Sequence, residues 1–596
     1  MKYDEKEFER SAAYYKKNLG RHAKGKNVLI VLGPENEIGF YSLAPLSRAL
    51  HDIGADVNAR IGKKKENRIL MERLWKTCSE MRGGKKNRKT RALKEFISAA
   101  EKKIKKGEFA KIFREPEIRI TGGKKGLTAS LGEKEIFLEY RAKWHRKFKW
   151  KELLRTSAKI LKYGYALKKS ERFTIGFELV PAKKDIEQPL EDYLDNYSIA
   201  RAMLLAAQKK CRSASLGAAT LRKSKLERME RVSDLSATIS GCEYSKKSGE
   251  KVFRKYASLC RALSLHEWKY SDAVFSIVGK GYGGKHLFGA MVGYPSPNGK
   301  TRWNSPGQMM LKPWWLMQTS LDKRMPKTRL GITETVPIKE FIETCNIDYA
   351  KMRSRNEKIK KAIEESEILH VHGTKVKGGV TKLKVELKKG RKRRHVQKSD
   401  SDARSKLDRR ALERSGVKAG MYANFPGGEA FLTPESVSGT AIGDVVINLD
   451  RSIPLSAENP IVVSFRKGKW KLERGPAVVK EKIRKELRDA KKLLRIYEKN
   501  RSLPKKIVNS YRKNFRMTGE FAINTNPKAK PSRYLIISEK IANMIHIALG
   551  SGFEPDRNTM YHWDFVINAP RQKLDIYGMD RHGRKKFILR KGKFAL

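Results

Sequence analysis

A strand, a helix and a second strand follow one another within about 35 residues near the start of the chain. The apolar run at 28–32 lies between turn residues, which is typical of a buried parallel strand. Leucine and isoleucine then recur at helical spacing over 41–54, and this segment stops at Gly54. A further strand begins at 56–60. This order predicts a βαβ unit and therefore an α/β fold.

The α/β pattern is interrupted and then resumes. Residues 62–116 hold 19 Lys and Arg against 7 Asp and Glu, and strand-like and helical pieces follow up to 268. The pattern of a buried strand returns at 271–279. We therefore expect an N-terminal, doubly wound α/β domain over 1–335, interrupted by a large basic insertion at about 62–268.

The chain changes character after this region. The expected helices lie at 337–344, 356–367 and 477–499, and an expected strand pair lies at 368–372 and 381–387. From 421 onward, short strands rich in Val, Ile and Phe alternate with Gly, Asn and Pro turns. We expect a second, mixed α/β domain over 336–596, in which the basic run 388–394 is a solvated loop.

The balance of charge is strongly basic. The chain has 131 Lys and Arg against 65 Asp and Glu, a formal net charge of +66. A field of this sign attracts polyanions such as RNA or a ribosome. The alternative is a general bias of amino-acid composition in which these charges only solvate the surface, since no RNA-binding signature motif is present.

The chain has no apolar run of the ~20 residues that span a bilayer, and its five cysteines show no CxxC spacing. We therefore expect a soluble, cytoplasmic protein.

Residues that carry chemistry gather in the C-terminal third. Glu429 and Glu520 each follow a glycine-containing turn and enter an apolar strand. His546 lies inside an apolar stretch, and His562 and Asp564 are two residues apart on a predicted strand, so they share a face. Each of them alone has an ordinary explanation as a core, turn or surface residue. Polar residues set repeatedly into apolar strands cost energy unless something pairs them, which favours a joint site.

Two glutamates, two histidines and one aspartate form a mixed set of imidazole and carboxylate ligands. Such a set suits Zn²⁺, Co²⁺ or Mn²⁺ better than Mg²⁺ or Ca²⁺. Five ligands exceed what one catalytic zinc takes from a protein, and they are about right for two metals that share a bridging carboxylate. The expected cofactor is therefore two divalent metal ions.

The same segments contain a series of motifs in a fixed order. They read Asn-x-Pro-x-Gly-Glu-x-Phe-x-x-Pro from Asn424, Gly-Glu-Phe-x-x-x-Thr-Asn-Pro-Lys-Ala from Gly519, His-Ile-Ala-Leu-Gly from His546, and His-x-Asp from His562. In this order they resemble the aminopeptidase T family of metallo-aminopeptidases. The resemblance is most specific over 420–570, and the stretch at 62–268 has no counterpart in it.

This resemblance implies a two-domain α/β protein with a dinuclear metal site in its C-terminal domain. A water activated by two metals would remove N-terminal amino acids from peptides. Carried over residue by residue, the metal ligands would be Glu429, Glu520, His546, His562 and Asp564. Glu520 would be the bridging carboxylate and also the general base.

One position departs from the family pattern. The family has a tyrosine seven residues after the histidine of His-x-Ala-Leu-Gly, where its hydroxyl is expected to stabilise the tetrahedral oxyanion. Phe553 stands there, and the loss of one oxyanion donor typically costs ~10²–10³ in turnover. Tyr561 and Tyr577 are the candidate substitutes.

Two functions therefore stay open. The first is an active metallo-aminopeptidase with peptide substrates. The second is a catalytically weak or inactive aminopeptidase-like scaffold that binds RNA or ribosomes through its basic surface. A homodimer is also left open.

Overall fold

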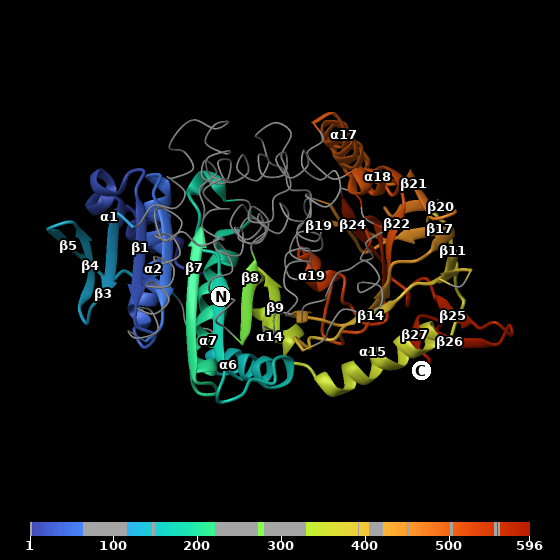
Figure 1. Ribbon diagram of the computed structural model, residues 1–596, viewed down its shortest axis with the longest axis horizontal. Helices are drawn as coiled ribbons and strands as arrows, with labels where there is room; N and C mark the ends of the chain where they lie inside the picture. The colour runs from blue at the N-terminus through green and yellow to red at the C-terminus, as the bar shows by residue number, and fades with distance from the viewer. Residues whose placement is uncertain are drawn as a thin grey trace, which may run out of the picture. The chain divides into compact units, whose positions relative to one another are not determined.

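The computed structural model divides the chain into two compact units, and each is described by itself (Figure 1). The described residues up to Ile342 belong to the first unit, and those from Glu343 onward belong to the second. The structure describes residues 3–63, 116–145, 149–186, 188–220, 272–278, 329–390, 392–404, 421–449, 452–500, 505–552, 557, 559 and 561–596. Most of the basic stretch 62–116 lies outside these residues.

Nine strands of the first unit lie in one sheet, in the order β9-β8-β6-β7-β2-β1-β3-β4-β5. Their bounds are β1 (Asn27–Leu32), β2 (Asp56–Ile61), β3 (Ile118–Gly122), β4 (Gly126–Leu131), β5 (Lys134–Glu139), β6 (Arg172–Phe177), β7 (Ser213–Thr220), β8 (Ala273–Val278) and β9 (Arg329–Glu334). The sheet core is apolar: Ile30 and Ile175, for example, are fully buried.

The predicted βαβ unit is part of this sheet. Strands β1 and β2 pair in parallel, and α2 (Glu37–Asp52) connects them. Strand β3 pairs in parallel with the other side of β1. Strands β7, β6, β8 and β9 are parallel to one another, and an antiparallel pairing of β2 with β7 joins the two groups.

We expected the stretch at 62–268 to be a basic insertion that interrupts the α/β domain, but part of it belongs to the sheet itself. The described residues of this stretch supply β3 to β7, and β3 and β7 pair directly with β1 and β2. Strand β5 alternates in burial and is largely exposed, so it lacks the continuous apolar run by which β1 was found. Because strands of this kind carry charged residues on their exposed face, their sequences do not show that they belong to the sheet.

The helices of the first unit begin at identifiable caps. The Asp4 side chain accepts a hydrogen bond from the Glu7 N–H at the start of α1, and Asn36 accepts one from Gly39 at the start of α2. Helix α1 packs on α2, and α7 packs on β6 and β7. The further bounds are α1 (Glu5–Ala23), α6 (Trp150–Lys159), a π-helical turn (Ile160–Gly164), a 3₁₀ turn (Lys183–Asp185) and α7 (Leu190–Gln208). Helix α14 (Ile338–Cys345) follows β9 in the chain.

The described residues of the second unit form two large antiparallel sheets. The eight-stranded sheet has the order β21-β20-β17-β11-β10-β25-β26-β27, and the seven-stranded sheet has the order β14-β16-β22-β23-β24-β18-β19. The bounds in the first are β10 (Ile368–Val376), β11 (Gly379–Glu386), β17 (Ser436–Gly443), β20 (Ile461–Arg466), β21 (Lys469–Arg474), β25 (Asp575–Met579), β26 (Lys585–Arg590) and β27 (Lys593–Phe594). Those in the second are β14 (Val396–Ser399), β16 (Glu429–Leu432), β18 (Val446–Asn448), β19 (Ser452–Pro454), β22 (Thr518–Asn524), β23 (Ile545–Gly550) and β24 (His562–Ile567); β15 (Met421–Asn424) precedes β16 in the chain.

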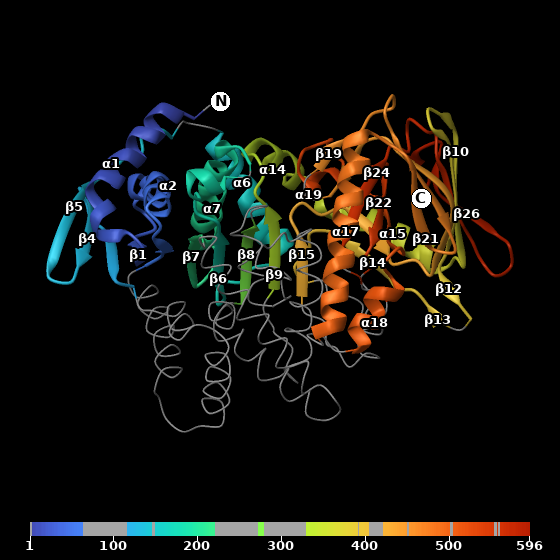
Figure 2. The same cartoon turned by 90° about the horizontal axis from the view of Figure 1, so that it is seen from above.

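The helices of this unit are α15 (Tyr349–Glu364), α17 (Ala477–Asn500), α18 (Lys505–Lys513) and the short α19 (Leu535–Ser538). Helices α17 and α18 lie side by side in both views (Figure 2). The expected helix at 477–499 and the strand pair β10–β11 are confirmed. Among the described residues, no helix combines the length and the apolar character that crossing a bilayer requires.

We expected the basic run 388–394 to be a solvated loop, and this prediction is wrong. The run forms a small hairpin of β12 (Lys388–Lys389) and β13 (Lys392–Arg393). The Arg393 guanidinium donates to the carbonyl oxygens of Ile363 and Ser366 at the end of α15, and Arg394 is buried against Glu435. The mixed α/β class predicted from the sequence is confirmed.

Candidate metal centre

The seven-stranded sheet places all five predicted residues on one face. Glu429 lies opposite Asn524, which shares a face with Glu520 four residues earlier. His546 lies opposite Ala522 on the same face. On the next strand, Asp564 lies opposite Ala548 and His562 lies opposite Gly550, each on that face again. The residues between them, Ala522, Ala548 and Gly550, are small, which leaves space above the sheet for the five longer side chains.

Two glycines allow the backbone conformation at the ends of the strands that carry these residues. Gly428 precedes Glu429 with φ of +135°, and a Cβ there would come within 2.7 Å of the Asn526 backbone nitrogen. Gly550 has φ of +104°, and its Cβ would clash with the Tyr561 carbonyl oxygen. Backbone at these angles favours glycine. The turn before β16 and the end of β23 therefore depend on residues that the sequence motifs contain.

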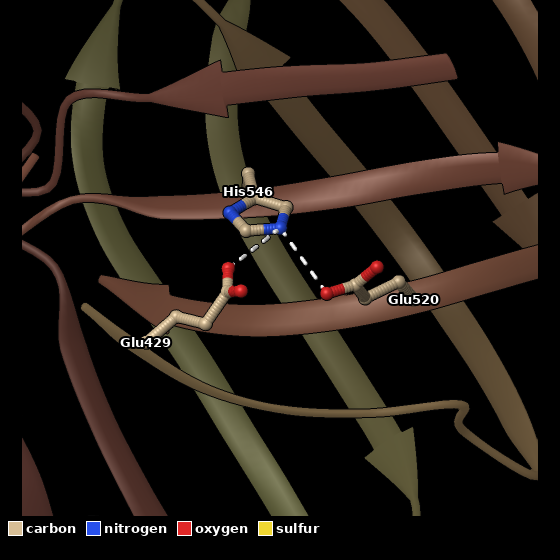
Figure 3. Close-up of side chains that lie close together, drawn as sticks. All are labelled: Glu429, Glu520 and His546. Carbon is tan, nitrogen blue, oxygen red and sulfur yellow. Dashed lines mark hydrogen bonds and ion pairs between the residues drawn. The ribbon is translucent and has the colours of Figure 1, made fainter. Parts of the chain in front are cut away.

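Glu520 lies between the two histidines. Its Oε1 is 3.3 Å from His546 Nε2, and its Oε2 is 3.5 Å from His562 Nε2. Glu429 Oε2 lies 3.7 Å from the same nitrogen of His546. Dashed lines in Figure 3 mark the contacts of both carboxylates with this imidazole. Asp564 Oδ1 lies 3.2 Å from His562 Nε2. Each imidazole thus faces two carboxylates, and the two imidazoles share Glu520.

The far nitrogen of each imidazole is fixed by an acceptor. His546 Nδ1 donates to Asn524 Oδ1 at 2.8 Å, and His562 Nδ1 donates to the Ser551 carbonyl oxygen at 2.6 Å. With Nδ1 occupied in this way, Nε2 is the nitrogen that faces the carboxylates and can bind a metal ion once it has lost its proton. Metal-binding histidines in proteins are held in this way by an outer hydrogen bond.

Two residues that the sequence reasoning missed complete the cluster. Lys540 is buried, and its Nζ lies 2.5 Å from Glu429 Oε1 and 2.7 Å from Glu539 Oε1. Glu539, His546 and Asp564 form one of the groups whose ligand atoms lie within 4.8 Å of one another. Glu539 and Lys540 directly follow α19 and approach from outside the sheet, so strand alternation gives no signal for them.

The buried carboxylates raise the affinity of both imidazoles for protons. Burial alone would lower the pKa of His546, but the hydrogen bond to Glu520 and the charges of Glu520 and Glu429 outweigh burial and raise this pKa to about 9. Burial also opposes the charge of His562, yet the charge of Asp564 raises its pKa to about 10. Burial raises the pKa of Glu520, and it raises the pKa of Glu539 to about 8. Four carboxylates share one lysine here, so protons or metal ions must balance the rest.

The residues fit a divalent metal. Three of the groups with metal-ligand spacing are Glu429 with Glu520 and His546, Glu520 with His562 and Asp564, and the group with Glu539. Glu429 Oε2 is buried and has no hydrogen-bond partner among the described residues. A buried carboxylate oxygen without a donor is costly, and a cation would satisfy it. The mixture of imidazole and carboxylate is typical of zinc and its neighbours in the first transition row.

All five predicted residues therefore meet at one place, while their role as ligands stays a prediction. Phe553 lies outside the described residues. Neither candidate substitute for the missing tyrosine faces the cluster. The Tyr561 hydroxyl donates to the Phe515 carbonyl oxygen, and its ring stacks on Trp563 with centroids 4.0 Å apart. Tyr577 lies on β25 in the other sheet and stacks on His370.

The comparisons with known proteins add little to this geometry. Neither a protein-family model nor a curated protein matches the chain. Wild-type AmpT from Thermus thermophilus is a solved structure that is similar to this chain with a TM-score of 0.41 and 15% identity, over 75% of this chain and 99% of that one. Similarity at this level carries no inference about the site, which rests on the residues themselves.

Proposed function

We propose that the chain is a metal-dependent aminopeptidase with two divalent ions in the cluster. The observation that carries this proposal is the position of Glu520, whose two carboxylate oxygens each face the Nε2 of a different histidine. A carboxylate in this position is suited to bridge two ions. The order of motifs that resembles the aminopeptidase T family supports a peptide substrate.

The two groups that share Glu520 divide the ligands. Glu429, Glu520 and His546 would hold one ion, and Glu520, His562 and Asp564 would hold the other. Bound divalent ions would supply Lewis acidity and lower the pKa of a water between them. Asn524 and the Ser551 carbonyl would keep both imidazoles in the tautomer that binds through Nε2.

Glu520 is also the group best placed to move a proton. A carboxylate within reach of the water that the two ions would activate can act as its general base. It would accept the proton of the attacking water and deliver it to the nitrogen of the leaving amine. The amide C–N bond breaks as that nitrogen is protonated, which releases the N-terminal residue.

A second function is favoured by two sequence features. Phe553 replaces the expected oxyanion donor, and the chain has a net charge of +66. A scaffold that keeps the metal site but has lost turnover, and that binds RNA through phosphate contacts, would show both features. This candidate shares the metal site with the first and differs from it in lacking hydrolysis.

A panel of aminoacyl anilides tests the proposal. We expect hydrolysis after addition of Co²⁺, Zn²⁺ or Mn²⁺, its loss in EDTA, and no hydrolysis of the N-acetylated forms. Metal content measured by mass spectrometry should reach two ions per chain. Stoichiometric metal binding without hydrolysis of any substrate would favour the scaffold, and the absence of metal binding would refute both candidates.

A further inference from the structure

Lys540 is the one lysine inside the metal cluster among the described residues. Its side chain is only 2% exposed, and its Nζ contacts Glu429 Oε1 and Glu539 Oε1. The mechanism above gives it no task. Burying a charge is costly unless groups of opposite charge pair with it, as two carboxylates do here. A buried ammonium kept so close to a reaction centre is therefore a functional candidate.

The backbone around Lys540 is held in place. Its N–H donates to the Ile537 carbonyl oxygen at 3.0 Å, and its own carbonyl oxygen accepts from the Asn526 N–H at 2.9 Å. The Asn526 side chain in turn donates to the carbonyl oxygens of Thr344 and Gly427. The ammonium is therefore fixed before any substrate arrives, which is the condition under which a donor stabilises a transition state without a cost of reorganisation.

One hydrogen-bond donor of this ammonium is still available within the described part of the chain. A lysine ammonium carries three N–H groups. Two of them are directed to carboxylate oxygens, one of Glu429 and one of Glu539. The third has no partner in the described residues. The ammonium is close to the proposed metal site, because it forms an ion pair with Glu429, whose other carboxylate oxygen faces His546.

The proposed reaction needs such a donor. When water attacks the peptide carbonyl, negative charge develops on the carbonyl oxygen. Phe553 stands where the family resemblance expects a tyrosine hydroxyl. The Tyr561 hydroxyl donates its hydrogen bond to the Phe515 carbonyl oxygen, and Tyr577 lies in the other sheet. Neither tyrosine therefore supplies the hydrogen bond to the oxyanion.

We propose that Lys540 is a catalytic residue that donates this hydrogen bond to the carbonyl oxygen of the substrate; the inference rests on the proposed aminopeptidase function. The water oxygen bonds to the carbonyl carbon, and the electron pair of the C=O π bond moves to the oxygen that faces Lys540. Glu520 takes the water proton. The pair then re-forms the C=O bond, the C–N bond breaks, and Glu520 returns the proton to the amine. No bond is made or broken at Nζ.

Three variants of the full-length chain test this role. Lys540→Met removes the ammonium with little change in length, Lys540→Arg keeps a charged donor, and Lys530→Met makes the same chemical change at an exposed position. For each we would measure kcat and KM on leucyl anilide, metal content, and the affinity of the Co²⁺-loaded protein for an α-aminophosphonate, which mimics the tetrahedral oxyanion. The affinity for free leucine reports ground-state binding.

We expect Lys540→Met to lower kcat by ~10²–10³ with KM nearly unchanged, as for a lost oxyanion donor. Affinity for the phosphonate should fall by a similar factor while affinity for leucine and metal content hold. Lys540→Arg should recover part of the loss, and Lys530→Met should match the original chain. Unchanged kcat and phosphonate affinity would overturn the inference, and so would a loss that excess metal restores, since Lys540 would then only position Glu429. If the original chain hydrolyses nothing, the proposed aminopeptidase fails, while phosphonate binding still decides whether Lys540 contacts the oxyanion.

Discussion

At the scale of single residues, Glu520 differs from the other carboxylates because both of its oxygens face an imidazole. We expect Glu520→Gln to abolish peptidase activity and to reduce metal content below two ions per chain, because a neutral amide bridges metals poorly and accepts no proton. Activity assays and mass-spectrometric metal analysis would measure both. The exposed Glu365→Gln is the matched control. Full activity in Glu520→Gln would remove this residue from the mechanism.

The protonation of the cluster gives a prediction about pH. His546 and His562 hold their protons more tightly in the folded, metal-free chain, with pKa values of about 9 and about 10, than the value of 6.5 expected after unfolding. Burial raises the pKa of Glu520 and Glu539 as well, which acts in the same direction. A folded state that binds more protons loses stability as pH rises. The histidine contribution is complete below pH 6.5 and is lost as pH rises through 9 and 10.

We therefore expect the free energy of unfolding of the metal-free chain to fall from pH 6.5 to pH 9.5. Bound metal requires deprotonated ligands, so metal affinity should rise over the same range and the metal-loaded chain should lose less stability. Urea denaturation with EDTA or with Co²⁺ would measure both. A metal-free stability that rises with pH in this window would contradict the assignment of the cluster as the dominant titrating unit.

Strand alternation explains which site residues the sequence could reveal. Glu429, Glu520, His546, His562 and Asp564 are polar residues inside apolar strands, so they stand out without a structure. Asn524 could have been found in the same way, because it lies four residues after Glu520 on one strand face. Lys540 could not, because it follows a one-turn helix, where no periodicity relates it to the sheet.

At the scale of elements, the hairpin β12–β13 shows how a basic run can be structural. The Arg394 guanidinium is only 2% exposed and lies 2.7 Å from Glu435, which also pairs with Arg557 at 3.0 Å. Burial raises the pKa of Glu435, but the charges of Arg394 and Arg557 outweigh burial and keep this pKa below its ordinary value. The hairpin is therefore fixed to the turn between β16 and β17 by a largely buried ion pair.

We expect Arg394→Ala to destabilise the second unit by about 3 kcal/mol, near the lower end of the range for breaking a buried ion pair, because Glu435 keeps Arg557. Lys389→Ala removes the same charge from an exposed position of the hairpin and should change stability little. Urea denaturation followed by circular dichroism would compare the two. Equal effects of the two substitutions would mean that the run acts only through its charge.

The sequence predicted elements best where periodicity is strong. The run at β1 and the helix α17 were found because one is continuously apolar and the other repeats at helical spacing. Strands β3 to β7 were assigned to an insertion, because pairing between β2 and β7 joins segments more than 150 residues apart. No local pattern encodes such a pairing, so sheet membership had to come from the structure.

At the scale of the whole molecule, a peptidase site does not explain the large positive net charge of the chain. Residues 62–116 alone carry a surplus of twelve positive charges, 19 minus 7, within a chain of net charge +66. A positive field repels the free amines of peptide substrates, whereas it attracts a polyanion. The cytoplasmic location and the homodimer stay predictions, as does RNA or a ribosome as partner, and RNA binding can be tested directly.

We expect the intact chain to bind RNA at ~50 mM salt without sequence preference and to lose most of that affinity by ~200 mM, because each neutralised phosphate releases counterions. Deleting 62–268 is unsuitable as a test, since β3 and β7 pair with β1 and β2 in the central sheet. Replacing Lys and Arg within 64–115 by Gln removes the charge and keeps the chain length that connects β2 to β3. Filter binding over a salt series should then show weaker affinity and a shallower salt slope. If this variant binds as tightly as the original chain, the stretch is not the RNA-binding element; if neither binds at ~50 mM salt, the charge only solvates the surface.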